Sequence, residues 1–247
     1  MKLGTLYGVS VGTGDPELIT VKGLRILQSS QIVAFPAGIN QRQGIAQNII
    51  QPWLLPQQKL LALDFPYIQD ELKLQLAWNK AADQVWYHLK QGIDVSFACL
   101  GDVSFYSTFT YLAQALQQIS TEVTIETVPG VSSPMAIASS LNIPLTVYQQ
   151  RLLILPVLYS VPELETALNY ADVIVLLKIS SVYQQVWQLL ESTNLLDSSV
   201  VIEKATFPEQ KIYRNLRVYP QLDLSYFSIM LISQAVNDHQ KNIDGLL

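Results

Sequence analysis

Three short segments place glycine beside hydroxyl or carboxylate side chains directly after an apolar run. They read GVSVGTGDPELITVKG (8–23), LGDVSFYST (100–108) and VPGVSS (128–133). Glycine lets the backbone turn sharply and lets a ligand approach the main-chain amides and carbonyls. Open α/β sheets hold their ligands at the carboxyl ends of the strands. If the three turns follow neighbouring strands of one sheet, they form a single binding site for a small molecule.

The first segment looks like a nucleotide phosphate loop but lacks the residues that such a loop needs. Five places after Gly8, where a Walker loop requires its second glycine, stands Thr13, and Lys22 lies within the expected helix. The dinucleotide fingerprint also fails, because Glu17 stands in place of its third glycine. Asp15 and Glu17 would repel a phosphate at the helix N-terminus. These features argue against both kinds of nucleotide site.

Each segment also has a purely structural interpretation. The first is equally consistent with a tight turn between a strand and a helix, without a ligand. Taken alone, Asp102 is better explained as the cap of the helix that follows it, and the segment 128–133 as a helix cap of the same kind. The conjunction of three such turns is what favours a binding site.

The elements that must position these turns alternate between strands and helices. In the first half we expect strands at 3–12, 31–36, 59–66 and 94–102, and helices at 16–30, 72–89 and 106–118. Asp15 and Pro16 form the start signal of the first helix, and Gly92 the stop signal of the second. Uninterrupted apolar strands in this order predict a parallel sheet covered by helices on both faces.

The second half has a different organisation. We expect a strand at 122–133, a helix at 134–142, and strands at 151–156, 172–180, 198–206, 209–216 and 226–234. The last three strands have no helices between them, which predicts a mixed sheet with antiparallel pairs. The fold class is therefore α/β with two domains, 1–120 and 121–247, and the ligand is expected between them.

Composition limits the function classes further. The chain has 247 residues, 49% of them hydrophobic, and a net charge of −5. An acidic chain lacks the basic face that nucleic acid requires. One cysteine (Cys99) and two distant histidines (His88 and His239) argue against a disulfide framework and a histidine-built metal site. Cys99 is expected to be a buried, inert thiol. The apolar run 173–177 is too short for a bilayer, so we expect a cytoplasmic protein that binds no membrane.

The three segments together resemble the tetrapyrrole methylases. The opening motif of that family is Gly-x-Gly-Pro-Gly-Asp-Pro-x-Leu-Leu-Thr-x-Lys-Ala, its second motif is a Gly-Asp-Pro turn followed by tyrosine, and its third is VPGVSS. LLKIS (176–180) and IEKAT (202–206) match as well, so the resemblance covers nearly the whole chain. LDFPY (63–67), GDVSFYSTF (101–109), RLLILP (151–156) and YFSIMLI (226–232) are most similar to members that methylate precorrin-2 at carbon 20.

The resemblance implies the fold of that family, with S-adenosylmethionine in a cleft between two α/β domains, and a homodimer. It also implies a set of cofactor-binding residues: Thr13, Leu100, Gly101, Asp102, Val103, Ser132, Ser133, Ile179, Ala205, Tyr226 and Ser228. Thr13 and Val103 stand where the family motifs have proline. Because proline stiffens a turn, both turns are expected to be looser here, with weaker cofactor binding but retained activity.

Methyl transfer from a sulfonium requires no protein nucleophile, so the absence of a catalytic triad is no objection. The protein must align the reactants and exclude water. Asp102 is expected to hold the cofactor's ammonium or ribose. Tyr106 is expected to face the macrocycle and remove a proton from the bridge carbon, although packing in the core explains this tyrosine equally well.

The tetrapyrrole acceptor carries acetate and propionate groups, which need cationic partners. Lys178 and Lys204 follow buried strands and are the best candidates, while Arg42 and Arg151 are candidates for the rim of the site. For each of these side chains a solvated surface position is the simpler interpretation. The expected activity is methylation of precorrin-2, or its cobalt form, in cobalamin synthesis. The alternatives are methylation of another tetrapyrrole position and binding of tetrapyrrole or cofactor without turnover.

Overall fold

The computed structural model describes residues 2–38, 43–66, 68, 70–158 and 161–234. Its chain divides into two compact units, Met1–Ser133 and Pro134–Leu247. The division falls after Ser133 rather than near residue 120, because the strand that follows residue 120 pairs with the first strand of the chain. Within the described ranges, no helix combines the length and the apolar character needed to cross a membrane.

The first unit contains a parallel sheet. Its five strands in the described residues are β1 (Thr5–Ser10), β2 (Ile32–Pro36), β3 (Lys59–Leu63), β4 (Val95–Cys99) and β5 (Thr124–Val128). Their order is β3-β2-β4-β1-β5, and every neighbouring pair is parallel. The predicted parallel sheet is confirmed, with the correction that β5 belongs to it and not to the second sheet.

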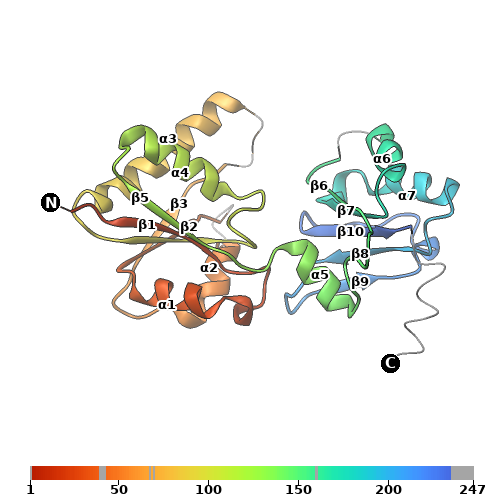
Figure 1. Ribbon diagram of the computed structural model, residues 1–247, viewed down its shortest axis with the longest axis horizontal. Coiled ribbons are helices and arrows are strands. Elements are labelled where there is room, and N and C mark those ends of the chain that lie inside the picture. The colour runs from red at the N-terminus through yellow and green to blue at the C-terminus, as the bar shows by residue number, and fades with distance from the viewer. Residues whose placement is uncertain (1, 39–42, 67, 69, 159–160, 235–247) are drawn as a thin grey trace. The chain divides into compact units, whose positions relative to one another are not determined.

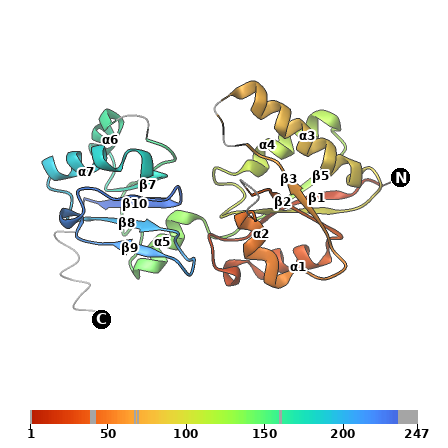
Figure 2. The same ribbon diagram turned by 180° about the vertical axis from the view of Figure 1, so that it is seen from behind.

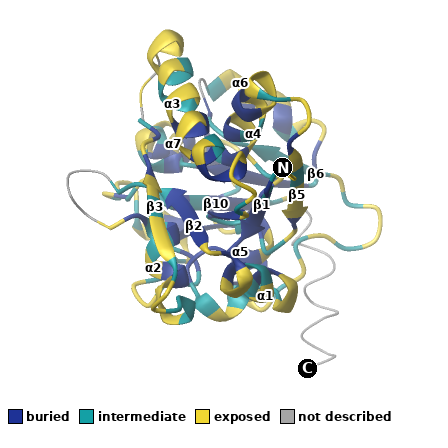
Figure 3. Ribbon diagram, turned by 90° about the vertical axis from the view of Figure 1, so that its left-hand side faces the viewer, coloured by how far each residue is buried: buried dark blue, intermediate teal, exposed yellow. Residues whose placement is uncertain are grey.

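Helices cover both faces of this sheet. They are η1 (Pro16–Leu18), α1 (Val21–Ser29), α2 (Ile45–Ile50), η2 (Gln51–Trp53), α3 (Glu71–Leu89) and α4 (Thr108–Ile119). Helices α1 and α2 lie on one face, and α3 and α4 on the other (Figures 1 and 2). Each pair packs on its own apolar cluster, around Leu27 and Ile49 on one side and Val85 and Leu112 on the other. The central strands are therefore buried, whereas β3 at the edge is largely exposed (Figure 3).

The helix predicted at 16–30 is interrupted in the structure. Asp15 and Pro16 start only the short η1, where the Asp15 carboxylate accepts a hydrogen bond from Glu17 N at 2.8 Å. A second cap follows, because Thr20 Oγ1 accepts from Gly23 N at 3.1 Å and starts α1. Two competing N-caps five residues apart thus divide one predicted helix into two.

The second unit contains a mixed sheet. Its strands are β6 (Leu152–Leu155), β7 (Val173–Leu177), β8 (Ser199–Glu203), β9 (Lys211–Tyr213) and β10 (Ser228–Ser233), in the order β6-β7-β10-β8-β9. Only β6 and β7 form a parallel pair among these strands; the other neighbours are antiparallel, as predicted for the last three strands. The helices are α5 (Ser133–Leu141), α6 (Val161–Leu168), η3 (Ile179–Ser181), α7 (Tyr183–Ser192) and η4 (Leu216–Val218).

The core of the first unit yields a prediction about stability. Leu112 on α4 is fully buried, whereas Leu72 on α3 is 79% exposed. Leu112→Ala should lower the free energy of unfolding by about 2–5 kcal/mol, because it leaves a cavity in close-packed surroundings. Leu72→Ala should change it by less than about 0.5 kcal/mol. Urea denaturation of the two variants measures both values, and equal losses would contradict the assigned core.

Candidate functional site

The three glycine turns lie together at the carboxyl edge of the first sheet. They follow β1, β4 and β5, which are neighbours and run in the same direction. The first two turns are joined directly: Gly101 N donates to Gly12 O at 2.7 Å, and Gly12 N donates to Gly101 O at 3.3 Å. Both glycines are left-handed, with φ of 75° and 74°. The expectation that the turns meet at one edge of a sheet is confirmed.

Asp102 joins the second turn to the third. Its Oδ2 accepts a hydrogen bond from Gly130 N at 2.7 Å, and its Oδ1 accepts one from Ser104 N at 2.8 Å. Burial raises the pKa of Asp102, but the hydrogen bonds from Ser104 and Gly130 outweigh it, so the pKa lies below its ordinary value of 3.8. The carboxylate is therefore charged at neutral pH and holds two turns in register.

Gly101 has open space on the side where a side chain would stand. A Cβ atom at Gly101 would meet nothing within 4 Å. At Gly12 it would lie 2.7 Å from Leu18 Cβ, and at Gly130 only 2.4 Å from Ser10 Cβ. The glycines at 12 and 130 thus serve close packing, whereas no neighbouring atom accounts for the glycine at 101. This open backbone fits the approach of a cofactor.

The other predicted residues of the first unit belong to the same turns or the segments next to them. Three of them are at least nine-tenths buried: Thr13, Val103 and Ser132. The other two, Leu100 and Ser133, are partly buried. Leu100 packs against the cluster beneath α1 and α2, and Ser133 is the first residue of α5. The structure thus brings the first-unit members of the predicted cofactor-binding set to one edge.

Tyr106 lies in the connection between β4 and α4, directly before the cap residue Ser107. It is 61% exposed, and its only ring neighbour among the described residues is Phe105, with centroids 4.7 Å apart. Its φ of 51° places it in the left-handed region, which is uncommon for a side chain of this size. Packing in the core therefore does not explain this tyrosine.

Cys99 is buried at the end of β4, as expected. Its Sγ lies 2.8 Å from Ser107 Oγ, the cap of α4. Burial raises the pKa of the thiol to about 12. The thiol is therefore protonated at neutral pH and takes no part in nucleophilic chemistry.

In the second unit, the predicted cofactor-binding residues and the two predicted lysines lie at one edge of the mixed sheet. Lys178 follows β7 and Lys204 follows β8, while antiparallel β10 begins beside both strand ends, with Ser228 opposite Glu203. Lys204 N donates to Phe227 O at 2.8 Å, which fixes the start of β10 to the end of β8. Both lysines are left-handed, with φ of 55° and 48°.

Two further features mark this edge. Lys178 Nζ lies 5.2 Å from the centre of the Tyr226 ring, within range of a cation–π interaction. Ser228 is fully buried, and its Oγ has no hydrogen-bond partner among the described residues. A buried hydroxyl without a partner is costly, so Ser228 fits a ligand that supplies one. Ile179 and Ala205, the remaining predicted residues here, are buried directly after the two lysines.

Glu203 is a buried carboxylate at the same edge that the sequence analysis missed. Its Oε1 accepts a hydrogen bond from Ser225 N at 2.7 Å, and its Oε2 accepts one from Tyr213 Oη at 2.9 Å. Burial raises the pKa of Glu203, but these hydrogen bonds outweigh it and bring the pKa below 4.5. The sequence feature that could have pointed to Glu203 is a single acidic residue at the end of the apolar strand β8.

The two predicted arginines are not part of this arrangement. Arg151 precedes β6 and pairs with Asp172, which precedes β7, with Nε 3.2 Å from Oδ2. Because β6 and β7 are parallel, Arg151 lies at the edge of the sheet opposite Lys178. The prediction that Arg151 lies at the rim of the same site is therefore wrong. Arg42 lies outside the described residues.

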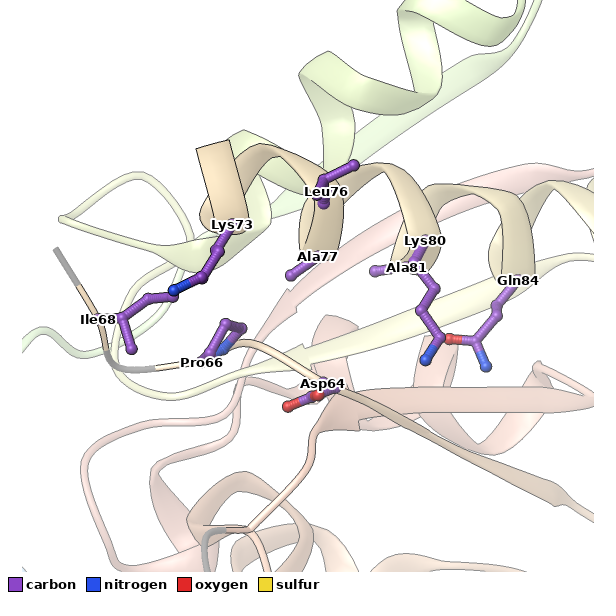
Figure 4. A pocket seen from close by; sticks show the side chains of 9 residues that line it. All are labelled: Asp64, Pro66, Ile68, Lys73, Leu76, Ala77, Lys80, Ala81 and Gln84. Carbon is purple, nitrogen blue, oxygen red and sulfur yellow. The ribbon is translucent and has the colours of Figure 1, made fainter. Parts of the chain in front are cut away.

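A hollow of about 380 Å³ lies elsewhere in the first unit, between α3 and the segment after β3 (Figure 4). Lys80 and Gln84 extend side by side from α3 toward it (Figure 4). Its lining residues are Asp64, Pro66, Ile68, Lys73, Leu76, Ala77, Lys80, Ala81 and Gln84, none of which belongs to the predicted set. No three His, Cys, Asp or Glu side chains gather to hold a metal ion in the described part of the chain.

The two buried carboxylates predict how stability depends on pH. Because hydrogen bonds hold both pKa values below 3.8 for Asp102 and 4.5 for Glu203, the unfolded chain takes up protons first as the pH falls. The stabilisation is thus complete above these ordinary values and is lost as the pH falls toward the folded ones. Urea denaturation should show a smaller acid-induced loss of stability for Asp102→Asn and Glu203→Gln than for the unmodified protein. Identical pH profiles would contradict the assigned hydrogen bonds.

Comparisons with known proteins point to one family. Residues 5–217 match the family model for Tetrapyrrole (Corrin/Porphyrin) Methylases. The cobalt-precorrin-2 C(20)-methyltransferase of Salmonella typhimurium is 33% identical, over 94% of this chain and 97% of that protein. The probable cobalt-precorrin-2 C(20)-methyltransferase of Methanocaldococcus jannaschii is 31% identical, over 84% and 85%.

A solved structure shares the fold. It is the uroporphyrin-III C-methyl transferase of Thermus thermophilus complexed with S-adenyl homocysteine, with a TM-score of 0.62 and 17% identity, covering 94% of this chain and 99% of that one. The matched residues include the three glycine turns and all strands of both sheets except β10. The chain therefore belongs to the tetrapyrrole methylases.

Proposed function

We propose that the protein transfers a methyl group from S-adenosylmethionine to carbon 20 of precorrin-2, or of its cobalt form, in cobalamin synthesis. Of two relatives more than 30% identical, one is named cobalt-precorrin-2 C(20)-methyltransferase and the other probable cobalt-precorrin-2 C(20)-methyltransferase. The observation that carries the proposal is the union of three turns around Gly101, whose left-handed backbone has open space beside it.

S-Adenosylmethionine is the cofactor of the tetrapyrrole methylases, and we extend it to this chain. In the first unit, the proposed contacts are Thr13, Leu100, Gly101, Asp102, Val103, Ser132 and Ser133. In the second unit they are Ile179, Ala205, Tyr226 and Ser228. Two observations support the fit: the open backbone of Gly101 and the buried Ser228 hydroxyl, which has no partner among the described residues.

For this reaction the protein must align the cofactor with the acceptor and exclude water; it does not need to supply a nucleophile. The cofactor would supply a methyl group on a sulfonium, the electron-rich bridge carbon would be the nucleophile, and S-adenosylhomocysteine would be the leaving group. The bonded turns hold the backbone of Gly101 in one geometry before the cofactor binds, and such preorganisation lowers the barrier to transfer. Asp102 acts chiefly through the turns that it joins, because both of its oxygens already accept hydrogen bonds.

Tyr106 and the two lysines are proposed to act on the acceptor. Tyr106 is exposed beside the second turn, where it is proposed to face the macrocycle and to help remove the bridge-carbon proton after methylation. Lys178 and Lys204 carry positive charge at one edge of the second sheet, where they would pair with acetate and propionate groups. From the family resemblance we also propose a homodimer. The cytoplasmic location expected from the sequence stays a proposal.

A product assay tests the proposed reaction. The protein is incubated with methyl-labelled S-adenosylmethionine and precorrin-2, with and without cobalt, and the labelled carbon is located by NMR. We expect the label on carbon 20. A label on another carbon would show that the enzyme methylates a different position of the macrocycle. Binding of S-adenosylhomocysteine without any labelled product would identify a binding protein without turnover.

The role of Gly101 gives a second prediction. Gly101→Ala should weaken the binding of S-adenosylhomocysteine at least about tenfold, because a methyl group would occupy the open space. Gly92→Ala is the matched control. Gly92 has a similar φ of 79° and precedes β4 at the opposite edge of the sheet. Both substitutions strain a left-handed backbone, but only one fills the proposed site.

Calorimetric titration measures both dissociation constants. The constant of the Gly92→Ala variant should stay within about twofold of the unmodified protein. Equal weakening in the two variants would assign the effect to backbone strain and contradict the role of Gly101.

A further inference from the structure

Ser10 is a buried serine outside the proposed cofactor-binding set. It is the last residue of β1 and is fully buried. Its Oγ donates to Val128 O at 2.7 Å and accepts from Val103 N at 2.8 Å. A hydroxyl has one donor and two acceptor positions, so both bonds form at once. One side-chain atom thus connects the end of β1, the end of β5 and the turn after β4.

The bond from Val103 matters because of the residue type at that position. Val103 is 4% exposed, so its amide depends on a partner within the protein. Proline, which the similar family motif carries here, has no amide hydrogen and needs no acceptor. A valine at this position therefore needs a hydrogen-bond acceptor for its amide, and Ser10 Oγ is that acceptor. The turn that the sequence analysis expected to be looser is tied to β1 by this bond.

The same serine also completes a closed ring of contacts around the turns. Ser10 bonds to Val103, the neighbouring Asp102 bonds to Gly130 N, and Gly130 lies against Ser10. The contact between Gly130 and Ser10 is close, since a Cβ at Gly130 would lie 2.4 Å from Ser10 Cβ. A shift of the turn at 101–103 would therefore have to break a hydrogen bond or open this ring.

We propose that Ser10 is a positioning residue, whose hydroxyl takes over from the missing proline in holding the turn at Gly101 in its cofactor-binding geometry. The inference rests on the proposed function, because it concerns the binding of S-adenosylmethionine by that turn. Ser10 acts through the Val103 amide and makes no contact with the cofactor itself.

The test combines Ser10→Ala, Val103→Pro and the double variant. Ser10→Ala should weaken the binding of S-adenosylhomocysteine about five- to tenfold, because the Val103 amide loses its acceptor. Adding Val103→Pro to Ser10→Ala should restore affinity to within about twofold of the unmodified protein, since proline removes that amide hydrogen. Val103→Pro alone should change affinity less than Ser10→Ala does. Calorimetric titration measures all three.

Ser96→Ala is the matched control. Ser96 is a fully buried serine on β4, with its Oγ 3.5 Å from Ile32 O and away from the turns. The Ser96→Ala variant should be less stable, because a buried hydroxyl is removed. Its affinity for S-adenosylhomocysteine should stay within about twofold of that of the unmodified protein. If Ser10→Ala behaves like Ser96→Ala, the serine is merely structural and the inference is overturned. Failure of Val103→Pro to rescue Ser10→Ala would overturn it as well.

Amide hydrogen exchange without ligand separates this inference from the proposed function. Ser10→Ala should speed exchange of the Val103 amide at least about tenfold, and Ser96→Ala should not. If the unmodified protein fails to bind S-adenosylhomocysteine, the proposed function is wrong. Faster exchange in Ser10→Ala then still supports the serine's hold on the turn, and unchanged exchange overturns it.

Discussion

The hydrogen bonds between Gly12 and Gly101, and between Asp102 and Gly130, join three turns that are far apart in the sequence. They form because β4, β1 and β5 are neighbours in a parallel sheet, so that their carboxyl ends meet at one edge. Left-handed glycines allow the first two turns to pair backbone to backbone. Everything proposed about cofactor binding depends on this union, because a single turn would leave the Gly101 backbone free to move.

The charge on Asp102 is part of the same constraint. A carboxylate at this position accepts hydrogen bonds from two backbone amides, which neither an alanine nor a valine side chain can do. Its role resembles that of Glu203 in the second unit, which receives hydrogen bonds from Ser225 and Tyr213 beside the start of β10. In each unit, a buried acidic residue fixes the backbone that carries the proposed binding residues: Asp102 in the turn after β4 and Glu203 at the end of β8.

Much of this arrangement could be predicted from the sequence, because local patterns encode it. Apolar β-branched runs predicted the strands, and the glycine-containing segments after them predicted the turns. The membership of β5 was not predictable in this way, since it depends on pairing with β1 across more than a hundred residues. The edge occupied by Arg151 was missed for a similar reason: it follows from the parallel direction of β6 and β7.

The roles of buried polar residues were also not predictable from the sequence. Ser10 and Glu203 stand within apolar strands, where a lone polar side chain gives no periodic signal. Their importance becomes visible only through partners such as Val103 and Tyr213, which the fold brings to them. The departure from proline at position 103 was visible in the sequence, but the compensating hydroxyl was not.

The central claim is that the joined turns of the first unit bind the cofactor. It is tested most directly by NMR titration of the labelled protein with S-adenosylhomocysteine, with NAD as the comparison. The account predicts that the amide resonances of 12–13, 100–103 and 130–133 move with S-adenosylhomocysteine and not with NAD. Shifts confined to the hollow beside α3, or movement of the turn resonances with NAD alone, would contradict it.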